Sequence, residues 1–329
     1  MGPVDLNAIV QQLDIPTPPE VIVGLQTSDD AGVYRLDGDL CLVMTADIIN
    51  PTCDDPYLYG RIAAANSLSD IYAMGGQPKA CLNLCCFPTK GIDRNWLTEI
   101  LRGALSTITE AGAALIGGHT VKDDVLKFGL SVTGLVKERD LTTNSGAKPG
   151  DVLILTKPIG TGVVMAGVKK GFVEDRADKL VYERMAQLNR SACEAMIAVG
   201  VNAATDITGF GLCGHGYEVA TASQVGIRFF DAKVPRWNVA EELIGQGIKT
   251  GVKLAESDSL PEIVRFHSDI QTDRQQLYFD PQTSGGLLIA VPENKSADLM
   301  QRLNNAGIDD AAICGEVFAA ERPHLEIQP

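Results

Sequence analysis

The sequence lacks several features that would place it in a broad class of protein. No stretch of its 329 residues approaches the ~18 uninterrupted apolar positions that a membrane helix needs. Basic residues are few, 28 Lys and Arg against 42 Asp and Glu, and the resulting net charge of −14 disfavours a nucleic acid or an anionic membrane as a partner. The first residues have neither a basic start nor a long apolar run, so we expect no secretory signal.

A disulfide framework is also missing from the pattern. The eight cysteines are scattered, and most lie inside apolar runs, which is typical of reduced thiols in a cytosolic protein. Cys81, Cys85 and Cys86 form one cluster, but no second ligand pair stands at a spacing compatible with a structural zinc site. We therefore expect buried thiols and a cytoplasmic location.

The length and the turn signals predict two α+β domains behind a short leading helix. Helical spacing of apolar residues over 4–13 is followed by a proline-rich stretch, so we assign 1–20 to an N-terminal helix and linker. A turn-rich segment at 147–151 then separates a first domain, 21–150, from a second domain, 151–329.

Apolar periodicity and capping residues predict elements in both domains. In the first domain the predicted elements are a strand over 40–45 whose end delivers Asp47, a helix over 61–74, a helix from 93 to 112, and strands over 113–117 and 127–136. In the second domain they are a strand over 152–156, a long helix over 176–199, helices near 211 and 240, a strand over 287–291 and a helix over 294–306.

Five aspartates stand out by their context: Asp29, Asp30, Asp47, Asp70 and Asp206. Mg²⁺ is usually held by one or two carboxylates together with phosphate oxygens and water, so dispersed aspartates of this kind could hold several ions around a triphosphate. Taken singly, each is better explained as a turn or cap residue, but their shared Gly, Ser and Thr surroundings favour a binding site. Asn66 shares a helix face with Asp70, which is compatible with a binding face and equally with a solvated polar stripe.

Glycine-rich segments recur at 116–120, 157–162, 207–212 and 283–286. Glycine lets backbone N–H groups converge on an anion, and a helix that begins behind such a loop adds a favourable dipole, so we expect anion-binding loops at these places. No Walker A motif is present, and the one GxGxxG match, Gly209–Gly214, follows no clear βαβ unit. His119 and His215 lack a surrounding ligand set and are expected to make hydrogen bonds.

Taken together, five segments of the sequence resemble those of the selenophosphate synthetases. The resemblance rests on Asp54–Gly76, Gly117–Thr120, Leu155–Gly160, Asp206–His215 and Asp280–Leu288, and it runs from about Asp29 to the C-terminus. Related families of the same ATP-binding superfamily share the Asp-Asp and Asn-x-x-x-Asp elements but not this whole series.

The resemblance implies a fold, a reaction and a set of site residues. The fold is the two-domain α+β architecture shared with aminoimidazole ribonucleotide synthetase, in which the first domain dimerises through strands and ATP lies in a cleft completed by the second subunit. The implied reaction turns ATP, selenide and water into selenophosphate, phosphate and AMP, with several Mg²⁺ ions, and with K⁺ as a further cofactor. By the same resemblance, Asp30, Asp70 and Asp206 match magnesium ligands, and the nucleotide contacts are Thr27, Ser28, Asp29, Asp47, Asn66, Asp70, Gly117, Gly118, His119 and Thr120, the last four in a loop that reaches the partner's nucleotide.

One part of the family pattern is not matched. Family members carry a glycine-rich segment with a Cys or selenocysteine and a nearby Lys before the first helix, whereas this chain has no Cys before Cys41 and no Lys before Lys79. No catalytic residue of that kind is therefore assigned here. A chain cut downstream of the segment and a natural paralogue without it both account for this, and in either case we expect nucleotide and Mg²⁺ binding to be retained and selenide-dependent turnover to be weak.

Two other readings remain open. Another enzyme of the superfamily, such as a thiamine-monophosphate kinase or a hydrogenase-maturation dehydratase, would make ADP where a selenophosphate synthetase makes AMP. A catalytically silent nucleotide-binding regulator would bind ATP tightly without turnover.

Overall fold

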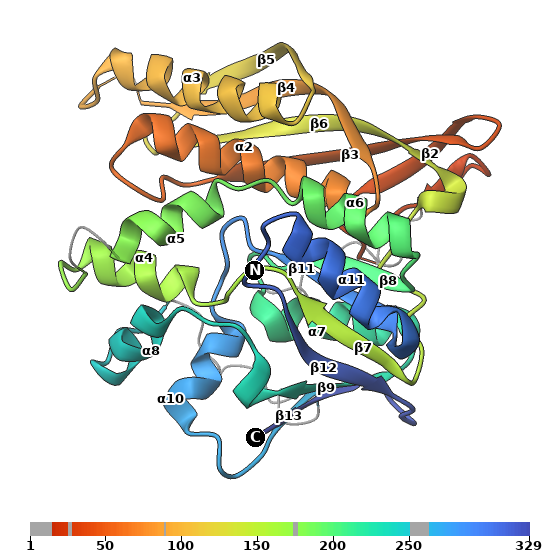
Figure 1. The fold of residues 1–329 in the computed structure, drawn as a ribbon. Coiled ribbons are helices and arrows are strands. Elements are labelled where there is room, and N and C mark those ends of the chain that lie inside the picture. The colour runs from red at the N-terminus through yellow and green to blue at the C-terminus, as the bar shows by residue number, and fades with distance from the viewer. Residues whose placement is uncertain (1–14, 26–27, 89, 174–176, 251–262) are drawn as a thin grey trace.

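The computed structural model describes residues 15–25, 28–88, 90–173, 177–250 and 263–329. Two mixed sheets organise the chain, one in each half, and each has helices packed against it (Figure 1). The predicted α+β class is confirmed. The helix predicted over 4–13 lies outside the described residues. No described helix combines the length and the apolar character that a membrane span requires.

The first sheet has six strands in the order β1-β2-β3-β6-β4-β5. They are β1 (Val21–Val23), β2 (Gly32–Asp37), β3 (Leu40–Ile49), β4 (Gln77–Phe87), β5 (Ala114–Lys122) and β6 (Lys127–Lys137). Only the β4–β5 pair is parallel; the other neighbours are antiparallel. Strand β3 runs four residues further than predicted, so Asp47 lies within the strand, paired with Leu130 of β6.

Helices α2 (Pro56–Ala73) and α3 (Arg94–Glu110) pack against each other beside this sheet (Figure 1). Asp55 caps α2 by accepting a hydrogen bond from the Leu58 N–H at 3.1 Å, which is why the helix begins five residues before the predicted start. Gly60 and Gly103 let the two helices approach closely, because a Cβ on Gly60 would lie 2.0 Å from the Ile100 carbonyl oxygen. The predicted cap Asp93 does begin α3.

The second sheet has seven strands in the order β10-β13-β9-β12-β7-β11-β8. They are β7 (Asp151–Leu155), β8 (Ala203–Asp206), β9 (Gly226–Phe230), β10 (Val264–Phe266), β11 (Leu287–Pro292), β12 (Ala312–Phe318) and β13 (His324–Gln328). The helices of this half are α4 (Thr161–Lys169), α5 (Ala177–Met185), α6 (Arg190–Val199), α7 (Gly211–Ser223), α8 (Asn238–Gly245), α10 (Thr272–Gln275) and α11 (Glu293–Asn305). Short 3-10 turns occur at Glu138–Asp140, Asp231–Lys233 and Gln276–Phe279.

The long helix predicted over 176–199 is wrong. The chain breaks after Met185 and restarts as α6 at Arg190, so that two shorter helices replace one. At the break the side-chain amide of Asn189 donates hydrogen bonds to Ser69 Oγ of α2 and to the Gly285 carbonyl, at 2.8 and 2.9 Å. Contact with the other half of the molecule therefore decides where the helix ends, which periodicity cannot reveal.

Helix α2 lies at the centre of the molecule. It contacts β3 and β6 of the first sheet and also β8, α5 and α6 of the second half (Figure 1). Most of its length is buried, as expected for a helix covered on more than one side. One apolar core accordingly continues from the first sheet through α2 into α6, β11 and α11, and the two halves pack as one body around it.

Candidate active site

Four of the predicted aspartates converge where the two halves meet. Asp30 precedes β2, Asp47 lies in β3, Asp70 lies in α2, and Asp206 ends β8 of the second sheet. The negative charge of Asp206 raises the pKa of each of the other three carboxyls. The structure therefore joins side chains that are up to 176 residues apart in one electrostatic cluster.

Neighbouring polar side chains hold the cluster in place. Thr205 Oγ1 donates to Asp30 Oδ1 at 2.8 Å, and the Asn66 amide donates to Asp47 Oδ2 at 2.6 Å. Thr45 Oγ1 donates a short hydrogen bond to Asp70 Oδ2. Asn66 and Asp70 thus share a buried face of α2, and the solvated-stripe interpretation is wrong.

Burial is the main cause of the raised pKa values in the cluster. It raises the pKa of Asp30 and Asp70 well above the usual range, and it raises the pKa of Asp206 as well. Burial and the charge of Asp206 raise the pKa of Asp47 to about 6, against the opposing hydrogen bond from Asn66. Carboxylates that repel each other away from water need cations nearby before all of them can ionise.

The carboxylate oxygens of the cluster fit a Mg²⁺ ion whose remaining ligands are phosphate oxygens and water. Asp30 Oδ2 and Asp206 Oδ2 are buried and have no hydrogen-bond partner among the residues that the structure describes, so each offers an oxygen to a cation. Within the described ranges, no group of three or more His, Cys, Asp or Glu side chains is arranged to hold a metal ion by itself. Mg²⁺ commonly takes one or two carboxylates and completes its shell with phosphate oxygens and water, so such a set is sufficient when a nucleotide is bound.

The predicted nucleotide contacts fall into four groups, and the first, Asp47, Asn66 and Asp70, lies in the cluster itself. Ser28 and Asp29 lie beside the cluster, where the backbone N–H of Asn144 donates to Asp29 Oδ1 at 2.7 Å and its amide donates to the Ser28 carbonyl at 2.9 Å. Thr27 lies outside the described residues. The segment 117–120 is not near the cluster within one chain.

The segment Gly117–Thr120 was expected to be a loop and is instead part of strand β5. Strand β5 is at the edge of the sheet, three strand spacings from β3, or ~14 Å at the usual ~4.8 Å per spacing. Gly118 has a φ of 154°, and a Cβ there would lie 2.4 Å from the Asn83 carbonyl oxygen of β4. Glycine is required here so that β5 can pair with β4.

The glycine-rich segment 157–162 was predicted to bind an anion and is closed by the protein's own side chains. Gln282 Oε1 accepts hydrogen bonds from the backbone N–H groups of Gly160 and Thr161, at 2.9 and 3.1 Å. Asp280 Oδ2 accepts from the N–H groups of Gly162 and Val163, at 3.0 and 3.2 Å. The first turn of α4 already has its acceptors, so the prediction for this loop is wrong.

His215 makes hydrogen bonds, as expected. Its Nε2 lies 3.4 Å from the backbone nitrogen of Phe210 and 3.2 Å from Thr208 Oγ1, and its Nδ1 lies 2.9 Å from Glu218 Oε2. Because the Phe210 N–H can only donate, Nε2 is the acceptor and Nδ1 carries the proton toward Glu218. His215 thereby fixes the glycine-rich turn that follows Asp206.

Comparison with known proteins assigns the family. The chain matches the model of the AIR synthase related protein N-terminal domain over residues 28–136 and the model of the C-terminal domain over 148–328. It is 45% identical over 317 residues to a selenide, water dikinase of Pelobacter propionicus, which covers 96% of this chain and 91% of that protein. It is 47% identical to a selenide, water dikinase of Caldanaerobacter subterraneus subsp. tengcongensis, with the same coverage. The chain belongs to the selenide, water dikinase family.

Solved structures agree with that family at the level of the fold. A thiamine-monophosphate kinase from Stenotrophomonas maltophilia K279a has a TM-score of 0.68 at 18% identity, covering 98% of this chain and 95% of that chain. The hydrogenase maturation protein HypE in complex with ATP has a TM-score of 0.69 at 18% identity, covering 94% of this chain and 87% of that chain. The selenide, water dikinase family thus has the two-sheet fold of these enzymes.

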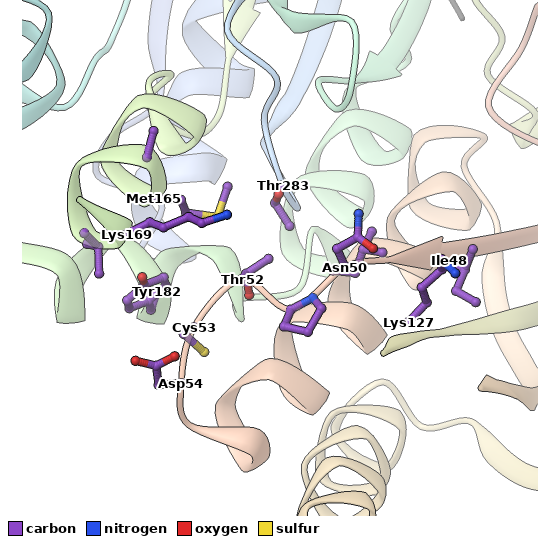
Figure 2. A pocket seen from close by; sticks show the side chains of 14 residues that line it. Ile48, Asn50, Thr52, Cys53, Asp54, Lys127, Met165, Lys169, Tyr182 and Thr283 are labelled. Carbon is purple, nitrogen blue, oxygen red and sulfur yellow. The ribbon is translucent and has the colours of Figure 1, made fainter. Parts of the chain in front are cut away.

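A cavity of about 830 Å³ lies between the halves of this family member, beside the carboxylate cluster. It begins along β3 immediately after Asp47, and Figure 2 shows side chains of both halves around it. Its lining residues are Ile48, Ile49, Asn50, Pro51, Thr52, Cys53, Asp54, Lys127, Met165, Ala166, Val168, Lys169, Tyr182 and Thr283. Two lysines line it, and Lys127 forms a salt bridge with Asp123 at 2.6 Å.

Sequence reasoning missed the buried lysine of the second half. Lys157 Nζ donates to the carbonyl oxygens of Gln187 and Ser284, at 2.8 and 2.9 Å. Burial lowers the pKa of Lys157 to about 7, although the charge of Asp206 acts in the opposite direction. A lysine in a glycine-rich segment was interpreted as part of an anion loop, whereas it ties two stretches of backbone together next to the cluster.

Proposed function

We propose that this protein uses Mg-ATP to phosphorylate selenide, giving selenophosphate, phosphate and AMP. The observation that supports this most strongly is the buried cluster of Asp30, Asp47, Asp70 and Asp206, which takes side chains from both halves and, within the described ranges, has two carboxylate oxygens without partners. Membership of the selenide, water dikinase family gives the reaction to which such a cluster belongs.

Each group of residues has a proposed task. Asp30, Asp70 and Asp206 hold Mg²⁺, which neutralises charge on the phosphates and orients them for transfer. Thr27, Ser28, Asp29, Asp47 and Asn66 contact the nucleotide. Both outer phosphoryl groups must leave to yield AMP, one passing to selenide and the other to water, so exclusion of water until selenide has reacted is the central requirement. The cavity beside Asp47 is where we place the approach of selenide, and K⁺ is the further cofactor we propose.

We also propose a homodimer that completes the nucleotide site. Gly117–Thr120 lie on β5, too far from the cluster to contact the same nucleotide within one chain, and nearly all of β5 is exposed. Large apolar side chains are exposed on the same sheet, among them Tyr34, Met44, Leu82 and Ile116, the last with 67% of its surface accessible. An apolar sheet face and an edge strand of this kind fit a second copy of the chain, which would bring its β5 to this chain's nucleotide.

Phosphorus-31 NMR tests the reaction through its products. The protein, at a concentration close to that of ATP, is incubated anaerobically with Mg²⁺ and with or without selenide. We expect AMP, phosphate and selenophosphate to appear together, and only when selenide is present. ADP as the final nucleotide would indicate chemistry of the thiamine-monophosphate kinase type, and ATP that stays bound and intact would favour a silent regulator. Weak selenide-dependent turnover stays a prediction. The rate of selenophosphate formation, compared with that of the Pelobacter propionicus selenide, water dikinase, measures it.

A further inference from the structure

The loop Thr283–Gly286 lies against the elements that carry the carboxylates. The Ser284 N–H donates to Asn66 Oδ1 at 2.9 Å, and the amide of Asn66 in turn donates to Asp47 Oδ2 at 2.6 Å. On the other side the Ile207 N–H, next to Asp206, donates to the Gly286 carbonyl at 2.9 Å. A Cβ on Gly285 would lie 2.1 Å from the Ile207 carbonyl oxygen, so this loop is pressed directly onto the end of β8.

The same loop also borders the cavity. Thr283 is one of the lining residues, and Figure 2 shows its side chain at the cavity wall. The loop therefore separates the carboxylate cluster from the space in which we place the approach of selenide.

Ser284 has two features that packing does not explain. Its φ is 50°, a left-handed conformation that few residues other than glycine adopt, and only 1% of its surface is accessible. Its hydroxyl is buried and has no hydrogen-bond partner among the described residues. Glycine would relieve the backbone strain and would leave no unpaired hydroxyl. A serine here therefore lowers the stability of the fold, and no hydrogen bond within the described residues offsets that loss.

Several hydrogen-bond donors around the cluster already have acceptors. Thr45 and Thr205 donate to Asp70 and Asp30, and the amide of Asn66 donates to Asp47. Lys157 donates to backbone carbonyls, including that of Ser284, and so holds the loop in its unusual conformation. Carboxylates can only accept, so a bound polyphosphate needs donors, and the hydroxyl of Ser284 remains uncommitted.

From this arrangement we propose that Ser284 Oγ donates a hydrogen bond to a β- or γ-phosphate oxygen of the bound Mg-nucleotide. This inference rests on the proposed function. Metal ions in nucleotide sites bridge the β- and γ-phosphates, so a donor beside the metal-binding carboxylates reaches those groups and not the α-phosphate.

Two variants and three ligands test the proposal by calorimetric titration. Ser284→Ala removes the hydroxyl, and Ser284→Gly removes the hydroxyl and the strain together. We expect both to weaken Mg-ATP binding by roughly tenfold, Mg-ADP binding to weaken as well, and AMP binding to stay within twofold of that of the unaltered protein, since a hydrogen bond to a charged acceptor is worth about one such factor. Without ligand, neither variant should melt at a lower temperature, and Ser284→Gly should melt highest.

Ser296→Ala is the matched control, because Ser296 is also buried but lies in α11, where its hydroxyl donates to the Glu293 carbonyl at 2.7 Å. This control should melt lower and bind Mg-ATP normally. Unchanged Mg-ATP binding by Ser284→Ala would overturn the proposal and leave a water molecule as the partner of the hydroxyl. Normal Mg-ATP binding by Ser284→Gly would likewise overturn it, because the shape of the loop and not the hydroxyl would then decide the affinity. An AMP affinity that falls as much as the Mg-ATP affinity would overturn it for the same reason. Failure of the unaltered protein to bind Mg-ATP would instead contradict the proposed function.

Discussion

At the scale of single residues, the burial of a titratable side chain makes the stability of this fold depend on pH. Asp280 is fully buried in the loop before β11, with Oδ2 accepting from the two backbone N–H groups of Gly162 and Val163. Burial raises the pKa of Asp280 to about 7, although the hydrogen bonds from Val163, Gln282 and Gly162 act in the opposite direction. The folded protein therefore keeps a proton on this carboxyl over a pH range in which the unfolded chain has lost it.

This difference predicts a pH dependence of stability. Because the folded pKa is raised, the unfolded chain releases its proton first as the pH rises from about 4 to 7, and the stability from the protonated carboxyl is lost over that range. Asp280→Asn cannot titrate, so its melting temperature should fall less between pH 5 and pH 7.5 than that of the unaltered protein. Differential scanning fluorimetry measures this, with the exposed Asp309→Asn as a control that should follow the unaltered protein. Parallel pH curves for all three proteins would contradict the assignment.

At the scale of elements, the sequence predicted the positions of strands and helices better than it predicted which side chains bind the backbone groups at their ends. The periodic apolar residues of α3, β6 and α11 placed those elements to within a few residues, because one face of each meets its own core. The anion loop predicted at 157–162 was wrong because Gln282, more than 120 positions away in sequence, occupies it. Glycine and a following helix are local signals, whereas the acceptor that fills the loop is a tertiary one.

The candidate site shows the same division. Asp30, Asp47, Asp70 and Asp206 were found from their glycine, serine and threonine surroundings, and the structure brings them together. Ser284 and Lys157 could not be assigned from sequence, because their significance lies in a missing partner and in burial, which only the packed loop defines. Asn66 was recognised as a neighbour of Asp70 on one helix face and, by the family resemblance, as a nucleotide contact. Its hydrogen bonds to both Asp47 and Ser284 make it the link between the two halves.

At the scale of the whole molecule, we propose that a second copy of the chain completes the site. The exposed face and edge of the first sheet predict a dimer, and Ile116, near the start of β5, is the most exposed large apolar residue of that sheet. Ile116→Glu should shift the protein from dimer to monomer in light scattering coupled to gel filtration, because a charge would have to be buried at the interface. It should also weaken ATP binding, since β5 of the partner would no longer reach the nucleotide.

Leu180→Glu is the comparison for that variant, because Leu180 of α5 is also an exposed aliphatic residue, with 53% of its surface accessible, and lies in the other half. It should remain dimeric and bind ATP as before. A dimer that survives Ile116→Glu with unchanged ATP affinity would place the interface elsewhere and would remove the proposed role of Gly117–Thr120.

The central claim is that carboxylates from both halves bind ATP through Mg²⁺, and titration calorimetry of ATP with and without Mg²⁺ tests it most directly. The unaltered protein should bind ATP tightly only with Mg²⁺, and Asp206→Asn should lose at least about tenfold of that affinity, given what is lost when even outer partners of a metal site are changed. The same variant should not melt at a lower temperature without metal, because it removes a buried carboxylate whose charge opposes those of Asp30, Asp47 and Asp70. ATP binding that is independent of Mg²⁺, or that is unchanged in Asp206→Asn, would contradict the account.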